Sequence, residues 1–181
     1  MITRRKYSLI IILLVTAVFI AASSTLAMAK TDVKKIVYQG SGKATVYFKS
    51  SVSYGDAKVI TKDSSNKTYS TTIKSKSSTK LQFKIAGYKT GKTYKITVKG
   101  LNSGDAVGSF KIYSKSKAAK TAKEKSKASG IKQVKTKSDT YNGYAVWRIT
   151  FNGRISGITY KFTYLIKQQT GQVMYSKREQ A

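Results

Sequence analysis

The sequence predicts a mainly β protein of two units, a sandwich of antiparallel sheets over residues 30–113 and a small α+β roll over residues 114–181. Three observations predict this fold class. Apolar and polar residues alternate with a period of two through the first unit, small residues then recur at helical spacing, and stronger strands follow. A helix followed by an antiparallel meander is an α+β arrangement.

The first 29 residues contain the three parts of a secretory signal. Basic residues come first, an apolar run extends from Leu9 to Ala22, and Ala27 and Ala29 supply the small residues of a cleavage site. We therefore expect residues 1–29 to be a cleaved signal peptide, and the protein to be secreted or extracytoplasmic and associated with the cell envelope. The alternative is an uncleaved membrane anchor, because Leu9–Ala29 is nearly long enough to span a bilayer.

The chain has 35 Lys and Arg against 7 Asp and Glu, a formal net charge of +28. Three of the basic residues lie in the signal, which leaves +25 for the mature part. Such a surface attracts polyanions over a range that salt shortens. The expected partners are therefore anionic cell-wall polymers or an anionic lipid surface, bound electrostatically and without specificity.

The strands of the first unit each have one apolar face, which is typical of a β-sandwich. Alternation is strong at 43–49, 80–85, 94–99 and 110–113, and weaker strands are expected at 35–38, 57–61 and 68–74. Lysines fill the polar positions, so we expect them on the outer faces of both sheets, as candidate binding residues. These lysines are Lys43, Lys49, Lys80, Lys84, Lys95, Lys99 and Lys111.

The segment Tyr88–Val98, with the sequence YKTGKTYKITV, resembles the corner between strands E and F of fibronectin type III domains. In that family a glycine-containing turn precedes a tyrosine that opens strand F. The resemblance implies an Ig/fibronectin-III-like sandwich over residues 30–113, with Tyr94 as a structural tyrosine whose hydroxyl bonds nearby backbone. Thr90 stands where the family has proline. A shared fold of this kind implies no function.

Residues 114–130 are rich in lysine and alanine and are expected to form either a helix or a flexible linker. Ala118, Ala122 and Ser126 lie at helical spacing, and Gly130 is a natural stop. Repulsion among the lysines would make such a helix marginal by itself. Both alternatives stay open at this point.

The strands after this segment are stronger. They are expected at 131–137, 144–152, 158–167 and 172–176. Asn142-Gly143 and Asn152-Gly153 are predicted to be hairpin turns. Trp147 lies between Val146 and Ile149, which favours a structural role in the core or on the sheet face.

The last third of the chain resembles a PepSY domain. Residues 144–151 (YAVWRITF) and 160–166 (YKFTYLI) are similar to its two main strands, and residues 167–173 (KQQTGQV) to its closing turn. The similarity covers about residues 114–178 and implies a structural place for Gly171 in that turn.

PepSY domains occur in propeptides of thermolysin-like metallopeptidases, so the resemblance implies a modulator of a secreted peptidase. The family's turn aspartate is Lys167 in this chain, which removes any role of that carboxylate. Strand edges around Ile158–Ile166 are where we expect a partner strand to add by β-augmentation.

The chain contains neither histidine nor cysteine, which excludes the usual general base, the thiol nucleophile and most zinc ligands. The seven acids show no glycosidase spacing and no calcium-loop pattern. We therefore expect no enzyme, no cofactor, no metal site and no dedicated nucleic-acid site. The predicted function is that of a non-catalytic exported binding protein, and the alternative is a matrix or adhesion component that assembles through its β-rich modules.

Overall fold

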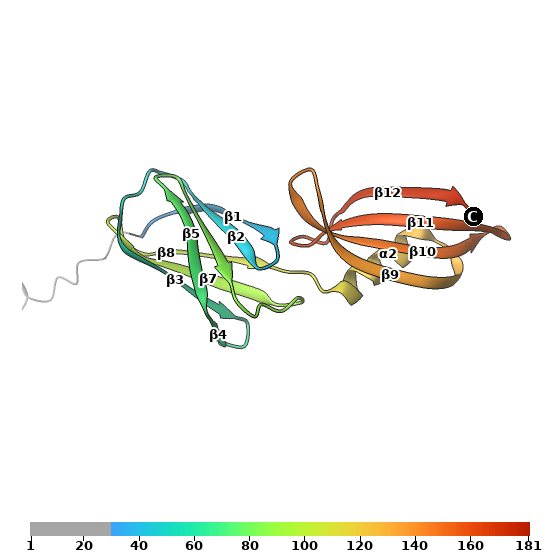
Figure 1. The fold of residues 1–181 in the computed structure, drawn as a ribbon, viewed down its shortest axis with the longest axis horizontal. Helices are drawn as coiled ribbons and strands as arrows, with labels where there is room; N and C mark the ends of the chain where they lie inside the picture. Colours follow the sequence, from blue (N-terminus) through green and yellow to red (C-terminus); the bar gives the residue numbers. More distant parts are fainter. Residues whose placement is uncertain (1–29) are drawn as a thin grey trace, which may run out of the picture.

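A computed structural model describes residues 30–181. The predicted signal peptide, with Ala27 and Ala29, lies outside the described residues. The described chain is mainly β, as predicted, with its strands in three antiparallel sheets of four strands each. Figure 1 shows two units side by side along the long axis, which we call the N-terminal unit (residues 33–111) and the C-terminal unit (residues 115–180).

The N-terminal unit consists of two sheets that pack face to face. One has the strand order β1-β2-β6-β5, and the other has the order β4-β3-β7-β8. The strands are β1 (Val33–Gly40), β2 (Lys43–Phe48), β3 (Tyr54–Asp63), β4 (Thr68–Tyr69), β5 (Thr71–Ser77), β6 (Lys80–Ile85), β7 (Thr93–Leu101) and β8 (Ala106–Lys111).

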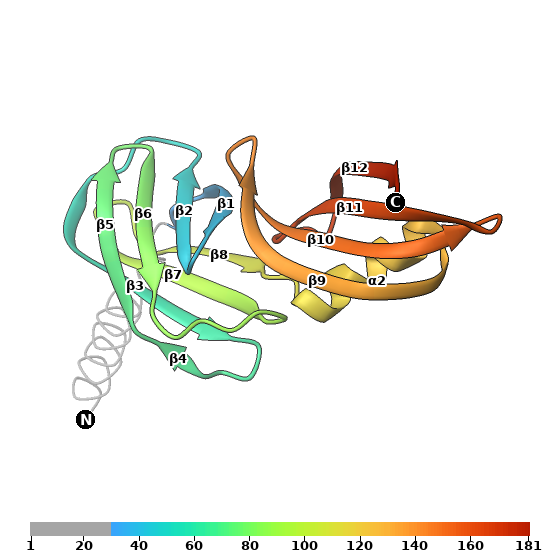
Figure 2. The ribbon, with the colours of Figure 1, turned by 45° about the vertical axis from the view of Figure 1, so that its right-hand side comes forward.

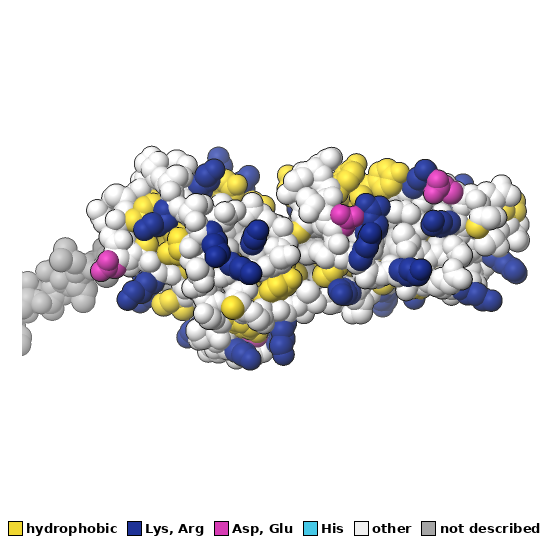
Figure 3. All heavy atoms as spheres, in the orientation of Figure 1, with side chains coloured by type: hydrophobic (Ala, Val, Ile, Leu, Met, Phe, Trp, Pro, Cys, Tyr) yellow, Lys and Arg dark blue, Asp and Glu magenta, His cyan; other side chains and the backbone are white. Residues whose placement is uncertain are grey.

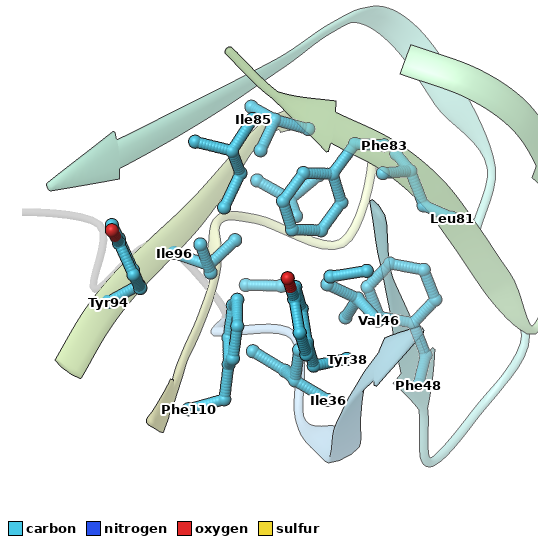
Figure 4. Close-up of a cluster of buried hydrophobic side chains, with 14 of the residues drawn as sticks. Ile36, Tyr38, Val46, Phe48, Leu81, Phe83, Ile85, Tyr94, Ile96 and Phe110 are labelled. Carbon is cyan, nitrogen blue, oxygen red and sulfur yellow. The ribbon is translucent and has the colours of Figure 1, made fainter. Parts of the chain in front are cut away.

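The core of this unit follows directly from the alternation in its strands. In β6, Leu81, Phe83 and Ile85 are fully buried, whereas Lys80 and Lys84, which point to the opposite face of the strand, are exposed. Figure 4 shows the apolar side chains of both sheets pointing toward one another. Burying a side chain of this size contributes about 1.5–3 kcal/mol, so the shared layer holds the two sheets together.

A helix, α2 (Lys115–Ser126), opens the C-terminal unit, so the linker alternative is wrong for this segment. It begins because the Ser114 side chain accepts a hydrogen bond from the Lys117 N–H at 3.2 Å. It ends at Lys127, three residues before the expected stop at Gly130, because Lys127 adopts the left-handed conformation with φ 54°. Burial of Ala118 and Ala122 against the sheet stabilises a helix that lysine repulsion would weaken.

The sheet of the C-terminal unit has the strand order β12-β11-β10-β9. Figure 2 shows α2 lying along one face of it. Trp147, Ile149, Phe151 and Phe162 pack on the helix from this face. The strands are β9 (Ser129–Tyr141), β10 (Tyr144–Ile155), β11 (Ile158–Lys167) and β12 (Val173–Gln180).

Asn142-Gly143 is the turn between β9 and β10, but Asn152-Gly153 is not a turn. It lies inside β10, and the hairpin turn to β11 is at Ser156-Gly157, where both residues have positive φ. Gly153 has a packing role, because a Cβ there would come within 2.8 Å of the Ala128 Cβ. The glycine therefore lets the chain entering β9 cross close to β10.

The expected free edge around Ile158–Ile166 is also wrong. This segment is β11, which pairs with β10 on one side and β12 on the other. An inner strand has no free backbone groups for a partner strand. The outer strands of this sheet are β9 and β12.

The turn between β11 and β12 joins the two units. The Gln169 side chain accepts a hydrogen bond from the Tyr38 N–H at 3.0 Å and donates one to the Ile36 carbonyl at 2.7 Å. The Tyr113 N–H donates to the Gln168 carbonyl, and the Trp147 indole N–H donates to the Tyr113 carbonyl at 2.9 Å. These bonds hold the turn against β1 and the connecting segment.

Candidate functional site

The seven candidate lysines of the N-terminal unit are all exposed and lie on both sheets. Lys43 and Lys84 are cross-strand neighbours, so two like charges lie side by side there. Lys49 and Lys99 each contact an aspartate, at 3.0 Å from Asp32 and 4.0 Å from Asp105. The structure therefore distributes these lysines over two outer faces and does not gather them into one site.

The three structural candidates lie in the core or in tight turns. Tyr94 is fully buried, and its hydroxyl both donates to the Lys89 carbonyl at 2.8 Å and accepts from the Lys89 N–H at 2.7 Å. Burial raises the pKa of Tyr94. Trp147 is 3% exposed. Gly171 has φ +74°, and a Cβ there would overlap the Tyr113 ring.

The acidic residues are largely neutralised in pairs. Six of the seven carboxylates contact a lysine or arginine within 4.0 Å, and the seventh acid is Asp56. Each such pair places a negative charge next to a positive one, so these acids form no acidic region on the surface. The remaining cations therefore set the potential around the protein.

Hydrogen bonds hold the Asp63 carboxylate in the turn between β3 and β4. The carboxylate accepts hydrogen bonds from the Ser65 N–H, the Lys67 N–H and the Tyr69 hydroxyl at 2.8, 3.1 and 3.1 Å. Burial raises the pKa of Asp63, but these bonds and Lys92 outweigh it, and the pKa lies below its ordinary value. Burial and the bond to Asp63 raise the pKa of Tyr69 to about 12. The group closes the turn between β3 and β4.

Two features of the described part of the chain concern metal ions and membranes. Residues 30–181 contain no group of three or more acids that could hold a metal ion. In the same residues no helix is both long enough and apolar enough to cross a bilayer.

The face of the C-terminal sheet that α2 leaves uncovered is strongly basic. Because alternate residues of a strand point to opposite faces and Trp147, Ile149 and Phe151 face the helix, Arg148 and Arg154 face away from it. Residues paired with them across the strands share that face. We call this surface the open face, and its basic residues are Lys132, Lys135, Lys137, Arg148, Arg154, Lys161, Lys167 and Lys177.

Two carboxylates lie on the open face, and each is engaged by a neighbour. Asp139 contacts the Arg148 side chain at 2.6 Å, which holds the pKa of Asp139 below its ordinary value. Glu179 contacts Lys177 at 2.7 Å, which lowers the pKa of Glu179 and raises that of Lys177. Figure 3 shows the resulting surface, with many basic and few acidic side chains on the visible side.

Tyrosines lie at the end of the open face that is near the N-terminal unit. Tyr141 and Tyr175 belong to the two outer strands, yet their ring centroids are only 6.0 Å apart, so the sheet curls here. Lys167 Nζ lies 3.7 Å from the centroid of the Tyr144 ring. Leu165 is only 2% exposed although its register places it on this face. Contacts within the protein therefore tie these side chains together, while Tyr144 and Tyr175 stay 37% and 39% exposed.

Two hollows indent the opposite end. One has a volume of about 270 Å³ and is lined by Gly130, Lys132, Gln133, Asn152, Gly153, Arg154 and Thr159. The other, of about 230 Å³, is lined by Gln133, Lys135, Thr150, Phe151, Asn152 and Lys161. They share the lining residues Gln133 and Asn152, so they lie next to each other, and no acidic side chain lines either of them. We call the two together the Asn152 depression.

Sequence reasoning missed this site. Lysines at 132, 135 and 137 are visible in the sequence, but the strand containing them shows no apolar alternation that assigns its faces. Only the position of α2 identifies the uncovered face.

No protein-family model, curated protein or solved structure matches the chain.

Proposed function

We propose that the protein is a non-catalytic exported binding protein that its positive charge retains at the anionic polymers of the cell envelope. The observation that carries this proposal is the pairing of carboxylates. Six of seven acids have a basic neighbour, so the large excess of lysine and arginine faces solvent without acidic regions between. A surface of one sign attracts polyanions and repels its own copies.

The resemblances supply a finer version of the proposal. The two facing sheets with the Tyr94–Lys89 contact support an Ig/fibronectin-III-like spacer, and a helix packed on four antiparallel strands supports a PepSY-like roll. By this reading the roll modulates a secreted peptidase that is held at the same wall. Its outer strands, β9 and β12, are the edges at which a peptidase segment would add.

Binding is preferred over the alternative of a self-assembling matrix component. Lys132, Lys135 and Lys137 lie on the outer strand β9, and Lys177 lies on the outer strand β12. Lysine on an outer strand opposes edge-to-edge pairing of copies. Static light scattering at rising protein concentration tests this preference, and we expect a constant monomer mass.

The retention test uses the chain from residue 30 onward, which contains both units. It is mixed with isolated cell walls at about 0.05 M salt and then washed up to about 1 M, where the screening length falls to about 3 Å. We expect retention at low salt and release at high salt. A protein that stays in solution at low salt would contradict the proposal, and walls stripped of their anionic polymers are the control.

The peptidase version has its own measurement. A secreted thermolysin-like metallopeptidase is assayed with a small peptide substrate while the protein is added in excess. We expect the turnover to change, because β-augmentation next to the peptidase cleft would alter substrate access. Unchanged turnover would remove the peptidase role and leave wall retention standing.

A further inference from the structure

We propose that the Asn152 depression binds the phosphate groups of a linear phosphate-bearing polymer. The proposal rests on the proposed function, since it places one specific contact within the general attraction of the surface for polyanions. It assigns the contact to the open face of the C-terminal unit and not to the lysines of the N-terminal unit.

Cations surround Asn152 in the plane of the sheet. Lys132 of β9 and Lys161 of β11 are the cross-strand partners of Asn152, one on each side. Because two strand spacings separate them, the backbones of these two lysines are about 10 Å apart. Arg154 and Lys135 also line the depression. Long, exposed side chains on opposite sides can converge on one anion above Asn152.

Two irregularities of β9 create the recess. The register between β9 and β10 shifts between Thr150 and Asn152 and again between Asn152 and Arg154. Gln133 and Gly130 absorb the extra residues with φ of +55° each. The Asn152 side-chain N–H donates to the Gln133 side-chain carbonyl at 3.1 Å, and these two residues line both hollows. The larger hollow has the volume of about nine water molecules.

The local charge is positive without compensation inside the depression. Four of its lining side chains are cations and none is a carboxylate. Glu179 is the cross-strand neighbour of Lys161, whose charge helps to lower the pKa of Glu179, but the Glu179 carboxylate contacts Lys177 at 2.7 Å and does not line the depression. Asp139 belongs to the other end of the face and contacts Arg148. A bound anion would therefore meet free donors.

The donor arrangement favours phosphate over carboxylate. Lys132, Arg154 and Lys161 belong to three neighbouring strands, β9, β10 and β11, so their donors can reach different oxygens of a tetrahedral anion, whereas a carboxylate presents two oxygens in one plane. An arginine can also bind phosphate through two parallel hydrogen bonds. A recess admits a chain more readily than a flat membrane.

The aromatic side chains argue against base recognition. Stacking platforms place exposed rings beside the basic groove. The exposed tyrosines lie at the far end of the open face, where Lys167 covers Tyr144 and Tyr141 contacts Tyr175. Phe151 is the one aromatic residue that lines the depression, and it is 1% exposed. The expected polymer therefore carries phosphates and needs no bases.

The test compares two double variants of the chain from residue 30 onward, each with two fewer positive charges. K132Q/K161Q removes the cations that flank Asn152, and K43Q/K84Q removes a cross-strand pair in the N-terminal unit. Affinity for long-chain polyphosphate is measured by calorimetry at about 0.15 M salt. We expect K132Q/K161Q to weaken binding by about tenfold and K43Q/K84Q by less than about threefold, because only the first pair makes directed charge-assisted bonds.

Nuclear magnetic resonance of the unsubstituted protein checks the location without any variant. Polyphosphate should shift the amide signals of Gln133, Asn152 and Arg154 more than those of β2 and β6. Equal losses in both double variants, or shifts spread over both units, would overturn the site but leave general polyanion binding intact. A protein that binds no polyphosphate at all would overturn the site and the proposed function together.

Further ligands decide the chemistry. Poly-L-glutamate of equal charge should bind about tenfold more weakly than polyphosphate, because its carboxylates fit three convergent donors less well. Per phosphate group, oligothymidylate and phosphatidylglycerol vesicles should bind the protein no more tightly than polyphosphate does. Equal binding of poly-L-glutamate, or a preference for the oligonucleotide or the vesicles, would overturn the assignment to a base-free phosphate polymer.

Discussion

The two units differ in what covers the buried face of each sheet and in what lies on the exposed face. In the N-terminal unit, two sheets share one core, so each buries one face against another sheet and large residues such as Phe83 and Tyr94 fill the layer. In the C-terminal unit, one helix with the small residues Ala118 and Ala122 covers one face of a single sheet. The second face of that sheet stays open, and basic residues solvate it.

This difference shows why similar lysine contents have different consequences. On the N-terminal unit, the lysines are divided between two outward faces that point in different directions. On the C-terminal unit, eight basic residues share one face of one curled sheet. Charges concentrated on one face add their potentials, which is why we place the proposed phosphate contact on the second unit.

The largest expected effect is the loss of unfolding free energy when a buried ring is removed from one unit or the other. Phe83→Ala and Phe151→Ala each remove a buried ring and should cost about 3–5 kcal/mol. Trp147, the chain's only tryptophan, is buried in the C-terminal unit, so its fluorescence reports that unit, while far-ultraviolet circular dichroism reports both. We expect F151A to lower the urea midpoint seen by fluorescence far more than F83A does. Equal shifts would mean that the units unfold as one.

A substitution in the turn that joins the units comes next. Gly171→Ala places a Cβ into the Tyr113 ring at a residue with φ +74°. Gly157 is a matched control, because it has φ +83° and open space around its Cβ position. Positive φ alone costs an alanine about 1–3 kcal/mol, so G157A should show that loss and G171A a larger one in thermal unfolding. Equal losses would show that Tyr113 moves aside.

The junction itself depends on one side chain. Gln169→Ala removes both bonds to the backbone of β1 and leaves two buried groups with weaker partners, at a cost of about 1–3 kcal/mol. Nitrogen-15 relaxation should then show the two units tumbling more independently, with little change in either core. Gln172→Ala, an exposed residue of the same turn, is the control. Ala145 of β10 is buried in the core cluster of the N-terminal unit, so joint tumbling in Q169A would show that this apolar contact suffices.

The smallest expected effect is the acid sensitivity of each unit. Asp63 in the N-terminal unit and Asp139 in the C-terminal unit both have a pKa below the ordinary value of 3.8. Their contribution to stability is therefore present above that value and is lost as pH falls through the lowered pKa. D63N should reduce the loss of stability of the N-terminal unit at low pH. D139N should do the same for the C-terminal unit, as followed by the Trp147 fluorescence. An unchanged pH profile would contradict this.

Local patterns predicted most strands but not the ends of irregular ones. Leu81, Phe83 and Ile85 alternate with lysines, and the structure buries these three residues as that pattern requires. Asn152-Gly153 resembles a hairpin turn in sequence, yet β10 runs through it because Gly153 accommodates the packing of Ala128. A dipeptide sequence indicates a preference for a turn, but it does not indicate which distant residue will pack against it.

The sequence by itself determined the mainly β fold, the positions of most strands and the large positive charge, because alternation, turn residues and composition are local properties. The tertiary structure decided which face of the last sheet α2 covers, how the bulges at Gly130 and Gln133 create a recess, and which acids pair with which bases. These features depend on contacts between residues distant in the chain, and β9, whose polar residues fit either face, acquires its facing only from its partners.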